Sequence, residues 1–440
     1  MLAFLGLTSL DELFAHIPAS VRLARGLDLA PGRSEPDVAA TFADYSAANA
    51  GQLARLTCYA GAGAYDHEVP AVVKMLSSRS EFVTAYTPYQ PEVAQGVLQA
   101  IFEYQTMVAR LSGLPVANAS LYDGATALVE ALNMAAGATR RSTMLVSAGV
   151  HPHWRAVVAT FARGTGHRVV EVPLRDGVTQ WGSVDVGEAA AVVVAYPNYL
   201  GVLEDMAAAA AMSRQTSGLF VVCGDPVAAG VLTSAGAWGA DVFVGEGQPL
   251  GTALSFGGPY LGLFACTHEQ IRRLPGRIVG ETVDSHDRRA FVTTLRAREQ
   301  DIRREKATSN VCTNQTLMAV TAAIQLGWLG TRGLAEVATR CARGAHYLYD
   351  ALVEVPGVTP VSRHAFVREF ALRLPRRASD VLEELADEGI LGGLSVAALA
   401  GESDPSIEGS TDDVVLIAVT ERRTRVELDR YADVLRKVLS

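Results

Sequence analysis

The sequence predicts an α/β protein with a mainly parallel sheet in a large domain, followed by a smaller α+β domain. Between residues 118 and 267, short apolar runs alternate with helical patterns, and runs such as Ala189–Tyr196 carry no charged residue. Strands buried on both faces of a parallel sheet have this composition. Beyond residue 357 the pattern changes to separate strands and amphipathic helices. A chain of 440 residues is long enough for two or three domains.

We expect three parts: an N-terminal helical arm at residues 1–57, a large α/β domain at residues 58–325 and a small α+β domain at residues 326–440. The first boundary falls where a Gly/Tyr-rich loop begins, Cys58–Pro70 (CYAGAGAYDHEVP). Such a loop is either a cluster of turns or a place where backbone approaches a ligand or partner. Sequence alone leaves both interpretations open.

The arm is expected to consist of short helices. Ser9 and Glu12 fit a capping box, which predicts a helix there. Pro18 and Pro31 interrupt the pattern, and Glu35 to Arg55 then predicts a longer helix.

The large domain alternates strands and helices. The predicted strands are Thr143–Ser147, Arg168–Val172, Glu188–Tyr196, Phe220–Cys223, Asp241–Val244 and Leu261–Thr267. The predicted helices are Glu92–Ser112, one that begins at Asp123–Thr126, Trp154–Arg163 and Met206–Thr216. After them, Ile271–Glu305 is rich in arginine, and we expect a solvated or inter-subunit surface there.

The C-terminal part opens with two apolar helices, Asn314–Leu329 and Leu334–Leu352, separated by a break at Gly330–Gly333. Thr424 and Glu427 form a capping box for the last helix. The remaining predicted elements are strands within Val358–Pro375 and Asp413–Val419 and helices at Ala378–Glu388 and Arg425–Val438.

Composition excludes several function classes. The net charge is −9 without a block of Lys or Arg, which argues against nucleic-acid binding. No run of about 18 uncharged apolar residues suggests a membrane span, and no secretory signal is visible. The five cysteines form no C-x-x-C pair, which is typical of reduced, buried thiols. We therefore expect a cytoplasmic protein.

Polar residues follow the predicted strands at their carboxyl ends, where ligands bind in parallel sheets. These residues are Asp123, His151, Asn198, Asp225 and Gln248. The run Asp123-Gly124-Ala125-Thr126 opens a helix, so its free N–H groups could hold an anion. Helix starts of this kind are also common without any ligand.

The stretch from Val221 to Pro259 has the order of features that lines a pyridoxal-phosphate site: a strand that ends in an aspartate, a second strand and Gly-rich turns. Asp225 follows an apolar strand, where it could hold a pyridinium nitrogen or simply cap the next helix. His151 could stack on a cofactor ring or simply end a strand. A Schiff-base lysine should follow the Asp241–Val244 strand, but that place holds Gln248, which cannot form an imine.

Lysine chemistry has only three positions open to it, Lys74, Lys306 and Lys437, and none follows a strand of the predicted sheet. The sequence also has no G-x-S-x-G, P-loop or H-E-x-x-H motif, and we expect no metal site. A complete active site within this chain is therefore not expected.

Several long motifs identify a resemblance. The chain resembles glycine decarboxylase, the P-protein of the glycine cleavage system, in its amino-terminal half, which in many bacteria is a separate first subunit. The motifs that carry the resemblance are GAGAYDHEVPAVV (61–73), TAYTPYQPEVAQGVLQAIFEYQTMVARLSGL (84–114), NASLYDGATALVEA (118–131), VHPHWR (150–155), VGEGQPLGTALSFGGPYLGLFA (244–265) and IRREKATSNVCTNQ (302–315).

The resemblance implies the type I pyridoxal-phosphate-dependent transferase fold, similar to aspartate aminotransferase. It places the catalytic lysine, the pyridoxal phosphate and the principal glycine site on a second subunit, so that this chain binds no cofactor covalently and has no catalytic residue of its own. It further implies an α2β2 assembly that passes its product to the lipoylated H-protein. The expected remnants of a cofactor pocket here are Asp123, Gly124, Ala125, Thr126, His151, Asp225 and Gln248.

In this fold, pockets at a dimer interface borrow loops from the neighbouring subunit. The segments expected to serve the partner's site are the Gly/Tyr loop at residues 59–65 and the two stretches that contain Tyr86, Thr87, Tyr89, Gln90, Gly257 and Gly258. Two alternatives stay open: a self-sufficient pyridoxal-phosphate enzyme with an unusual lysine, and a non-catalytic scaffold on the same fold.

Overall fold

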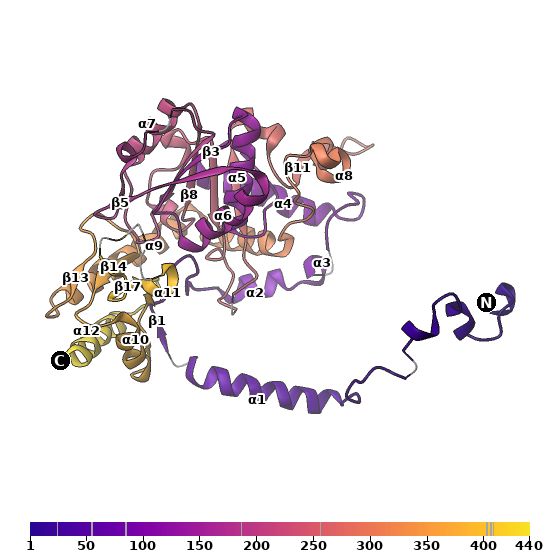
Figure 1. Ribbon diagram of the computed structural model, residues 1–440, viewed down its shortest axis with the longest axis horizontal. Coiled ribbons are helices and arrows are strands. Elements are labelled where there is room, and N and C mark those ends of the chain that lie inside the picture. The colour runs from indigo at the N-terminus through magenta and orange to yellow at the C-terminus, as the bar shows by residue number, and fades with distance from the viewer. Residues whose placement is uncertain are drawn as a thin grey trace. The chain divides into compact units, whose positions relative to one another are not determined.

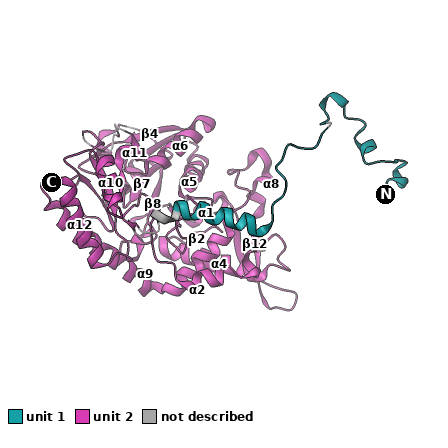
Figure 2. Ribbon diagram, turned by 90° about the horizontal axis from the view of Figure 1, so that it is seen from below, with its two compact units in different colours: residues 1–55 teal, residues 56–440 magenta. Residues whose placement is uncertain are grey.

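The computed structural model describes residues 1–440 except 24, 54–55, 84–85, 186, 256, 402–403, 405–406 and 408. The chain forms two compact units, Met1–Arg55 and Leu56–Ser440 (Figure 2). The boundary that we predict between residues 325 and 326 stays a prediction, and one helix, α9 (Thr316–Val353), runs across it.

The first unit contains little regular structure before α1 (Glu35–Leu53). The predicted helix near Ser9 is wrong: only short 3-10 turns form, at Ala3–Leu5, Asp11–Phe14 and Ala19–Val21. The Glu12 carboxylate accepts both the Thr8 backbone N–H and the Ser9 hydroxyl at 3.3 Å, but the turn that follows does not continue into an α-helix. Helix α1 begins at the predicted residue, and its predicted end at Arg55 lies outside the described residues.

A seven-stranded sheet forms the centre of the second unit (Figure 1). Its strands, from one edge to the other, are β2 (Val116–Ala117), β10 (Gly262–Cys266), β9 (Val242–Glu246), β8 (Leu219–Gly224), β7 (Ala191–Tyr196), β3 (Thr143–Ser147) and β4 (Arg168–Val172). The five strands from β9 to β4 are parallel, and β10 is antiparallel to both of its neighbours. The predicted mainly parallel sheet is confirmed.

Helices cover both faces of this sheet, so both faces are buried. On β3, Met144 and Val146 pack into one apolar cluster with α5 (Gly124–Thr139) and α6 (Pro152–Thr165). Leu145 points to the opposite face and packs with residues of three further helices. Those helices are α4 (Gln95–Ser112), α7 (Met206–Thr216) and the first part of α9. Alternation along the strands explains why the strands read as continuous apolar runs.

A second, antiparallel sheet carries the C-terminal part. Its order is β13 (Thr359–Pro360), β14 (Glu369–Arg373), β17 (Val414–Ala418) and β16 (Leu394–Ser395). The helices α10 (Ala378–Asp387) and α12 (Arg425–Leu439) pack on it, with the second part of α9. The capping box predicted for α12 is present, whereas the strand predicted across Val358–Pro375 is reduced to β13 and β14.

Two further features concern the connection between the large sheet and the C-terminal part: a short strand pairing and a break in α9. Strand β1 (Thr57–Cys58) pairs in parallel with β15 (Ile390–Leu391), so the start of the second unit is bonded to its C-terminal part. Helix α9 is interrupted at Gly330, where φ is 60° and ψ is −177°, which confirms the predicted break. No helix among the described residues is both long and apolar enough to cross a membrane.

The Arg-rich stretch contains a hairpin that the sequence did not predict. It consists of β11 (Ile278–Val283) and β12 (Arg289–Thr294). The remaining short elements are α2 (Ala71–Ser77), α3 (Ser80–Val83), β5 (Leu174–Arg175), β6 (Val178–Thr179), α8 (Gln300–Arg303), α11 (Val396–Ala400) and 3-10 turns at Trp181–Ser183, Ala228–Gly230, Gly236–Trp238, His268–Arg273, Arg296–Arg298 and Arg304–Lys306.

Candidate functional site

A cavity of about 90 Å³ lies at the carboxyl ends of β7, β8 and β9. This is the edge of the sheet at which the sequence places polar residues, and three of them, His151, Asn198 and Asp225, line the cavity together. The other polar or aromatic side chains that line it are Tyr65, Trp154, Tyr199, Glu246, Arg368 and Glu369. Arg368 and Glu369 come from the start of the second sheet, so the cavity lies where the two sheets meet.

Both oxygens of Asp225 are engaged within the chain. Oδ1 accepts the backbone N–H groups of Val227 and Ala228 at 2.8 and 3.1 Å, which caps the turn after β8. Oδ2 lies 2.5 Å from Nη2 of Arg368, in a pair whose side chains are 15% and 3% exposed. Burial alone would lower the pKa of Arg368, but Asp225 and other acidic groups outweigh it and raise the pKa. Asp225 therefore caps a turn and neutralises a buried cation.

Arg368 is held on two further sides. Its guanidinium carbon lies 3.6 Å from the centroid of the Tyr65 ring, and Nη1 donates to Nε2 of His67. Because a guanidinium can only donate, Nε2 of His67 must accept, and its proton lies on Nδ1. Nδ1 then donates to the Glu421 carboxylate at 2.6 Å. A continuous polar network thus joins β8 to the end of the second sheet.

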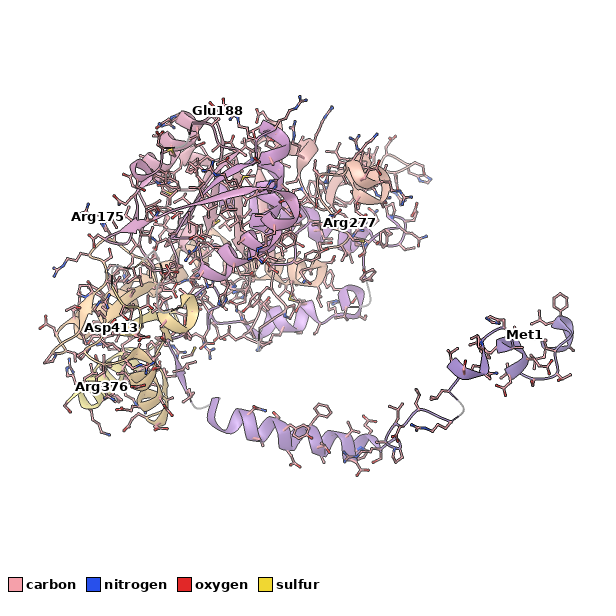
Figure 3. The ribbon with its side chains drawn as sticks, in the orientation of Figure 1. Met1, Arg175, Glu188, Arg277, Arg376 and Asp413 are labelled. Atoms are coloured by element: carbon pink, nitrogen blue, oxygen red, sulfur yellow. The ribbon has the colours of Figure 1, made fainter. Side chains whose placement is uncertain are left out.

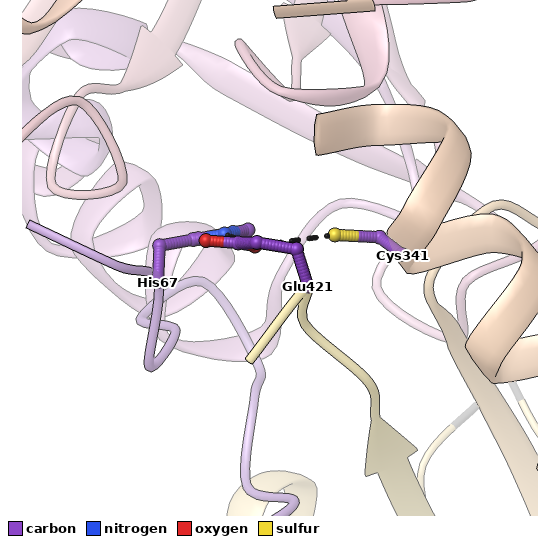
Figure 4. A group of neighbouring side chains, drawn as sticks. All are labelled: His67, Cys341 and Glu421. Atoms are coloured by element: carbon purple, nitrogen blue, oxygen red, sulfur yellow. Dashed lines mark hydrogen bonds and ion pairs between the residues drawn. The ribbon is translucent and has the colours of Figure 1, made fainter. Parts of the chain in front are cut away.

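The same network contains a set of side chains that could ligate a metal, which the sequence did not predict. Atoms of His67, Cys341 and Glu421 lie within 4.8 Å of one another (Figure 4). The Cys341 thiol donates to Glu421 at 3.5 Å, and burial raises the pKa of that thiol. Both nitrogens of His67 are already in hydrogen bonds, one of them to a cation. This arrangement fits a hydrogen-bond network better than a metal site.

The N-terminus of α5 is the predicted anion site, and its N–H groups are also engaged. Asp123 and Thr126 form a capping box, with the Thr126 N–H donating to Asp123 Oδ1 at 2.8 Å. The Gly124 N–H donates to Oε2 of Glu246 at 2.9 Å. Residues 123–126 do not line the cavity themselves, and Gly124 is linked to it by the hydrogen bond to Glu246, a residue that the sequence analysis did not select.

Gln248 lies two residues beyond β9's last residue and is 1% exposed. Its Oε1 accepts the Tyr65 N–H at 2.9 Å, and its Nε2 donates to the backbone oxygen of Thr252 at 2.7 Å. The amide ties the Gly/Tyr loop to the turn after β9. An amide nitrogen is neither basic nor nucleophilic, so Gln248 supplies no amine that could form an imine at this position.

His151 caps α6: its Nδ1 accepts the His153 N–H at 3.1 Å. Burial lowers the pKa of His151 to about 4, with smaller contributions from His153 and Arg155, so the ring is neutral near pH 7. Across the cavity, Glu369 accepts the Ala62 N–H at 2.7 Å and the Tyr65 hydroxyl at 2.8 Å. Burial raises the pKa of Glu369 to about 7.

Of the segments predicted to serve a partner, the 59–65 loop lines this chain's own cavity through Ala62, Gly63 and Tyr65, whereas the stretches at residues 86–90 and 257–258 do not line it. Tyr86 and Tyr89 are 74% and 49% exposed. The Thr87 hydroxyl is 3.1 Å from the Thr313 hydroxyl, and the backbone oxygen of Gln90 accepts the Val93 N–H at 3.2 Å. Gly257 and Gly258 have φ values of 102° and 156°, and a side chain added at Gly257 would meet open space.

Comparison with known proteins identifies the family. The family model described as "Glycine cleavage system P-protein" matches residues 1–435. The chain belongs to the glycine cleavage system P-protein family. The chain is 46% identical over 438 residues to a probable glycine dehydrogenase (decarboxylating) subunit 1 of Geobacillus kaustophilus, covering 99% of this chain and 96% of the relative. A second relative with the same description, from Moorella thermoacetica, is 45% identical and covers 100% and 97%.

Solved structures give the same result. A crystal structure of glycine decarboxylase (P-protein) of the glycine cleavage system, in inhibitor-bound form, is 44% identical with a TM-score of 0.91, and the match covers 100% of this chain and 97% of that one. A NifS-like protein is 13% identical with a TM-score of 0.63, which reports the fold alone. The P-protein chain therefore has the type I fold of pyridoxal-phosphate-dependent enzymes, as predicted.

The residues present in this P-protein chain do not fit pyridoxal phosphate. Gln248 cannot form an imine, and its amide is fully hydrogen-bonded. Asp225 faces Arg368 rather than open space, and the Gly124 N–H is bonded to Glu246. Sequence reasoning found Asp225 and Gln248 from their places after strands. It missed Glu246, which is the last residue of β9, and Arg368, which directly precedes β14.

Proposed function

We propose that this chain is the first subunit of a two-chain glycine dehydrogenase (decarboxylating) and that it serves a pyridoxal-phosphate site carried by the second subunit. One observation carries the proposal: Gln248, buried and hydrogen-bonded at both amide atoms, stands where a Schiff-base lysine would be needed. The printed description of the relatives, subunit 1, supports the existence of a second subunit.

The assembled enzyme would bind glycine, release CO2 and pass the aminomethyl group to the lipoyl arm of the H-protein. Pyridoxal phosphate on the second subunit would supply the electron sink for decarboxylation. We expect an α2β2 assembly in the cytoplasm, with no metal.

This chain would complete the partner's pocket with its exposed aromatic segment, residues 86–90, and with the turn at Gly257–Gly258. Exposed tyrosines are enriched at interfaces, where a ring adds contact area at a small entropic cost. The segment is stiffened by Pro88 and Pro91, and the contact between Thr87 and Thr313 fixes its base. These features support a preformed loop that a partner can receive without ordering it.

Two rival functions make different predictions. A self-sufficient enzyme would need Lys74, Lys306 or Lys437 near the cavity, but none of them lines it, and Lys437 pairs with Glu388 at 2.5 Å. Such an enzyme, purified alone, would be yellow and trapped by borohydride, and we expect neither. A pure scaffold would be dispensable for turnover by the second subunit.

The test is co-expression with the second subunit and measurement of glycine-dependent CO2 release in the presence of lipoylated H-protein. We expect Tyr89→Leu and Gln90→Ala each to lower the rate at least about tenfold, since each removes a contact that is formed only in the assembly. Tyr347→Phe and Gln99→Ala are matched controls in α9 and α4. Rates that stay unchanged in all four variants would overturn the assignment of this loop.

A further inference from the structure

The N-terminus of α5 is closed by a carboxylate from the same chain. Glu246, the last residue of β9, is 8% exposed. One of its oxygens accepts the Gly124 N–H at 2.9 Å. The other accepts the N–H groups of Gln248 and Leu261 at 3.0 and 2.9 Å. Three backbone donors thus converge on one carboxylate, which is how proteins hold a bound anion.

The space above this helix end is also filled. The indole of Trp154 packs against Gly124 so closely that a β-carbon built on Gly124 would lie 2.2 Å from the indole ring. A phosphate at this helix end would have to displace the Glu246 carboxylate. The fluorescence of Trp154 would report the exchange of the Glu246 carboxylate for phosphate, because the indole contacts Gly124, whose N–H donates to either anion.

A second charged side chain of this chain lies in the same cavity, at Asp225. Asp225 lies at the end of β8, where a carboxylate would face a pyridinium nitrogen, and Arg368 occupies its free oxygen at 2.5 Å. Arg368 is fixed by Tyr65, by His67 and by complete burial. Its guanidinium therefore takes the position of a cationic ring nitrogen toward Asp225.

We propose that this chain fills its own cofactor pocket: the Glu246 carboxylate takes the place of a phosphate at α5, and the Arg368 guanidinium takes the place of a pyridinium nitrogen at Asp225. Three features then prevent cofactor binding: Gln248 in place of a lysine, the Glu246 carboxylate at α5 and the Arg368 guanidinium at Asp225. This inference rests on the proposed function in one respect, that the cofactor belongs to the second subunit. We further infer that the hydrogen bonds and ion pairs inside the pocket hold the two sheets together.

The first experiment uses inorganic phosphate as the probe and the full chain alone. We expect Glu246→Ser, which frees three N–H donors, to bind phosphate with a saturable change in Trp154 fluorescence. The unaltered chain should show no such change up to at least ten times the phosphate concentration that half-saturates the variant. Adding Trp154→Phe to Glu246→Ser should remove the signal while calorimetry still detects binding. Saturable phosphate binding by the unaltered chain, reported by Trp154, would overturn the proposal and needs no variant to fold.

The second experiment restores the amine. In Gln248→Lys, condensation of the new amine with the aldehyde of pyridoxal phosphate would form an imine and release water, and borohydride would reduce the imine to a stable secondary amine. We expect little labelling in Gln248→Lys alone and at least tenfold more in the triple variant with Glu246→Ser and Arg368→Met. Arg368→Met keeps a long apolar stem over Tyr65. Melting temperatures identify variants that remain folded, and Glu246→Gln provides a milder replacement.

Stoichiometric labelling of Gln248→Lys alone would overturn the inference, because Glu246 and Arg368 would then be no barrier. That outcome leaves the proposed function intact if CO2 release by the assembly still depends on Tyr89 and Gln90. Loss of that dependence with weak labelling of Gln248→Lys would instead contradict the assignment of the loop under the proposed function and would leave this inference intact.

Discussion

The guanidinium carbon of Arg277 lies 4.7 Å from the centroid of the Tyr89 ring. Arg277 directly precedes β11 (Figure 3) and is 7% exposed, and its Nη1 is buried with no hydrogen-bond partner among the described residues. Arg277, the residue before the hairpin that the sequence did not predict, therefore supports the aromatic segment that we assign to the partner's site.

We expect Arg277→Met to loosen Tyr89 and to lower kcat/KM of the assembled enzyme by about 2- to 30-fold, the equivalent of roughly 0.5–2 kcal/mol for a cation–π contact. The matched control is Arg425→Met, which removes a similar contact with Tyr347 at 3.7 Å in the second sheet's helices. An Arg277→Met enzyme with the unaltered kcat/KM would show that the stacking does not position Tyr89.

Removal of one partner from the Asp225–Arg368 pair should destabilise the chain strongly. Arg368→Met leaves Asp225 buried beside no cation, which typically costs about 3–5 kcal/mol in the free energy of unfolding. Asp225→Asn with Arg368→Met should be less destabilised than the sum of the single variants. Urea unfolding of the four proteins measures this coupling.

The control for that cycle is the exposed pair of Arg340 and Glu336, 2.7 Å apart on α9. Arg340→Met should change the free energy of unfolding by less than about 1 kcal/mol. Equal effects at the buried and the exposed pair would contradict the role given to Arg368.

The neutral state of His151 predicts a dependence of stability on pH. Burial lowers its pKa to about 4 from the ordinary 6.5, so the unfolded chain binds the proton first as the pH falls. The contribution of His151 is complete above pH 6.5 and is lost between pH 6.5 and 4, by about 3 kcal/mol at most. Thermal unfolding of His151→Asn should show a weaker loss over this range, whereas the exposed-loop variant His286→Asn should follow the unaltered chain.

Gly201, in the loop after β7, lies against the backbone of β14 in the second sheet. Its φ is 85°, and a β-carbon built there would lie 1.8 Å from the backbone oxygen of Glu369. Gly201→Ala should destabilise the chain by roughly 1–2 kcal/mol for the backbone conformation and a further 1–3 kcal/mol for the overlap. Gly166→Ala isolates the first contribution, because Gly166 has a φ of 75° and open space around it; equal losses in the two variants would exclude the overlap.

Local signals made much of the fold predictable. The strands Thr143–Ser147 and Arg168–Val172 and the helix Met206–Thr216 were predicted with their observed ends, because apolar runs and clear flanking turns define them. The β11–β12 hairpin was missed, since its buried Ile278, Val279 and Phe291 are separated by exposed charges and threonines. The prediction of a helix near Ser9 was wrong because no residue of the turns at Ala3–Leu5 and Asp11–Phe14 is buried, so no packing stabilises a helix there.

The site was predictable only in part, for a different reason. Asp225 and Gln248 follow strands and could be found by position. Glu246 bonds to Gly124 and Arg368 pairs with Asp225, and both partners are more than 100 residues away in the sequence. The periodicity of the sequence gives no information on such long-range pairs. The positions therefore become visible only when the two sheets are brought together.

The pairing of Asp225 with Arg368 restricts which substitutions can be accepted at these two positions during evolution. A change at either position leaves the other as a lone charge in the interior, so a one-step replacement is penalised and a double replacement is tolerated better. Among related first subunits, we expect positions 225 and 368 to covary, and a lineage in which both have become apolar would still hold the two sheets together.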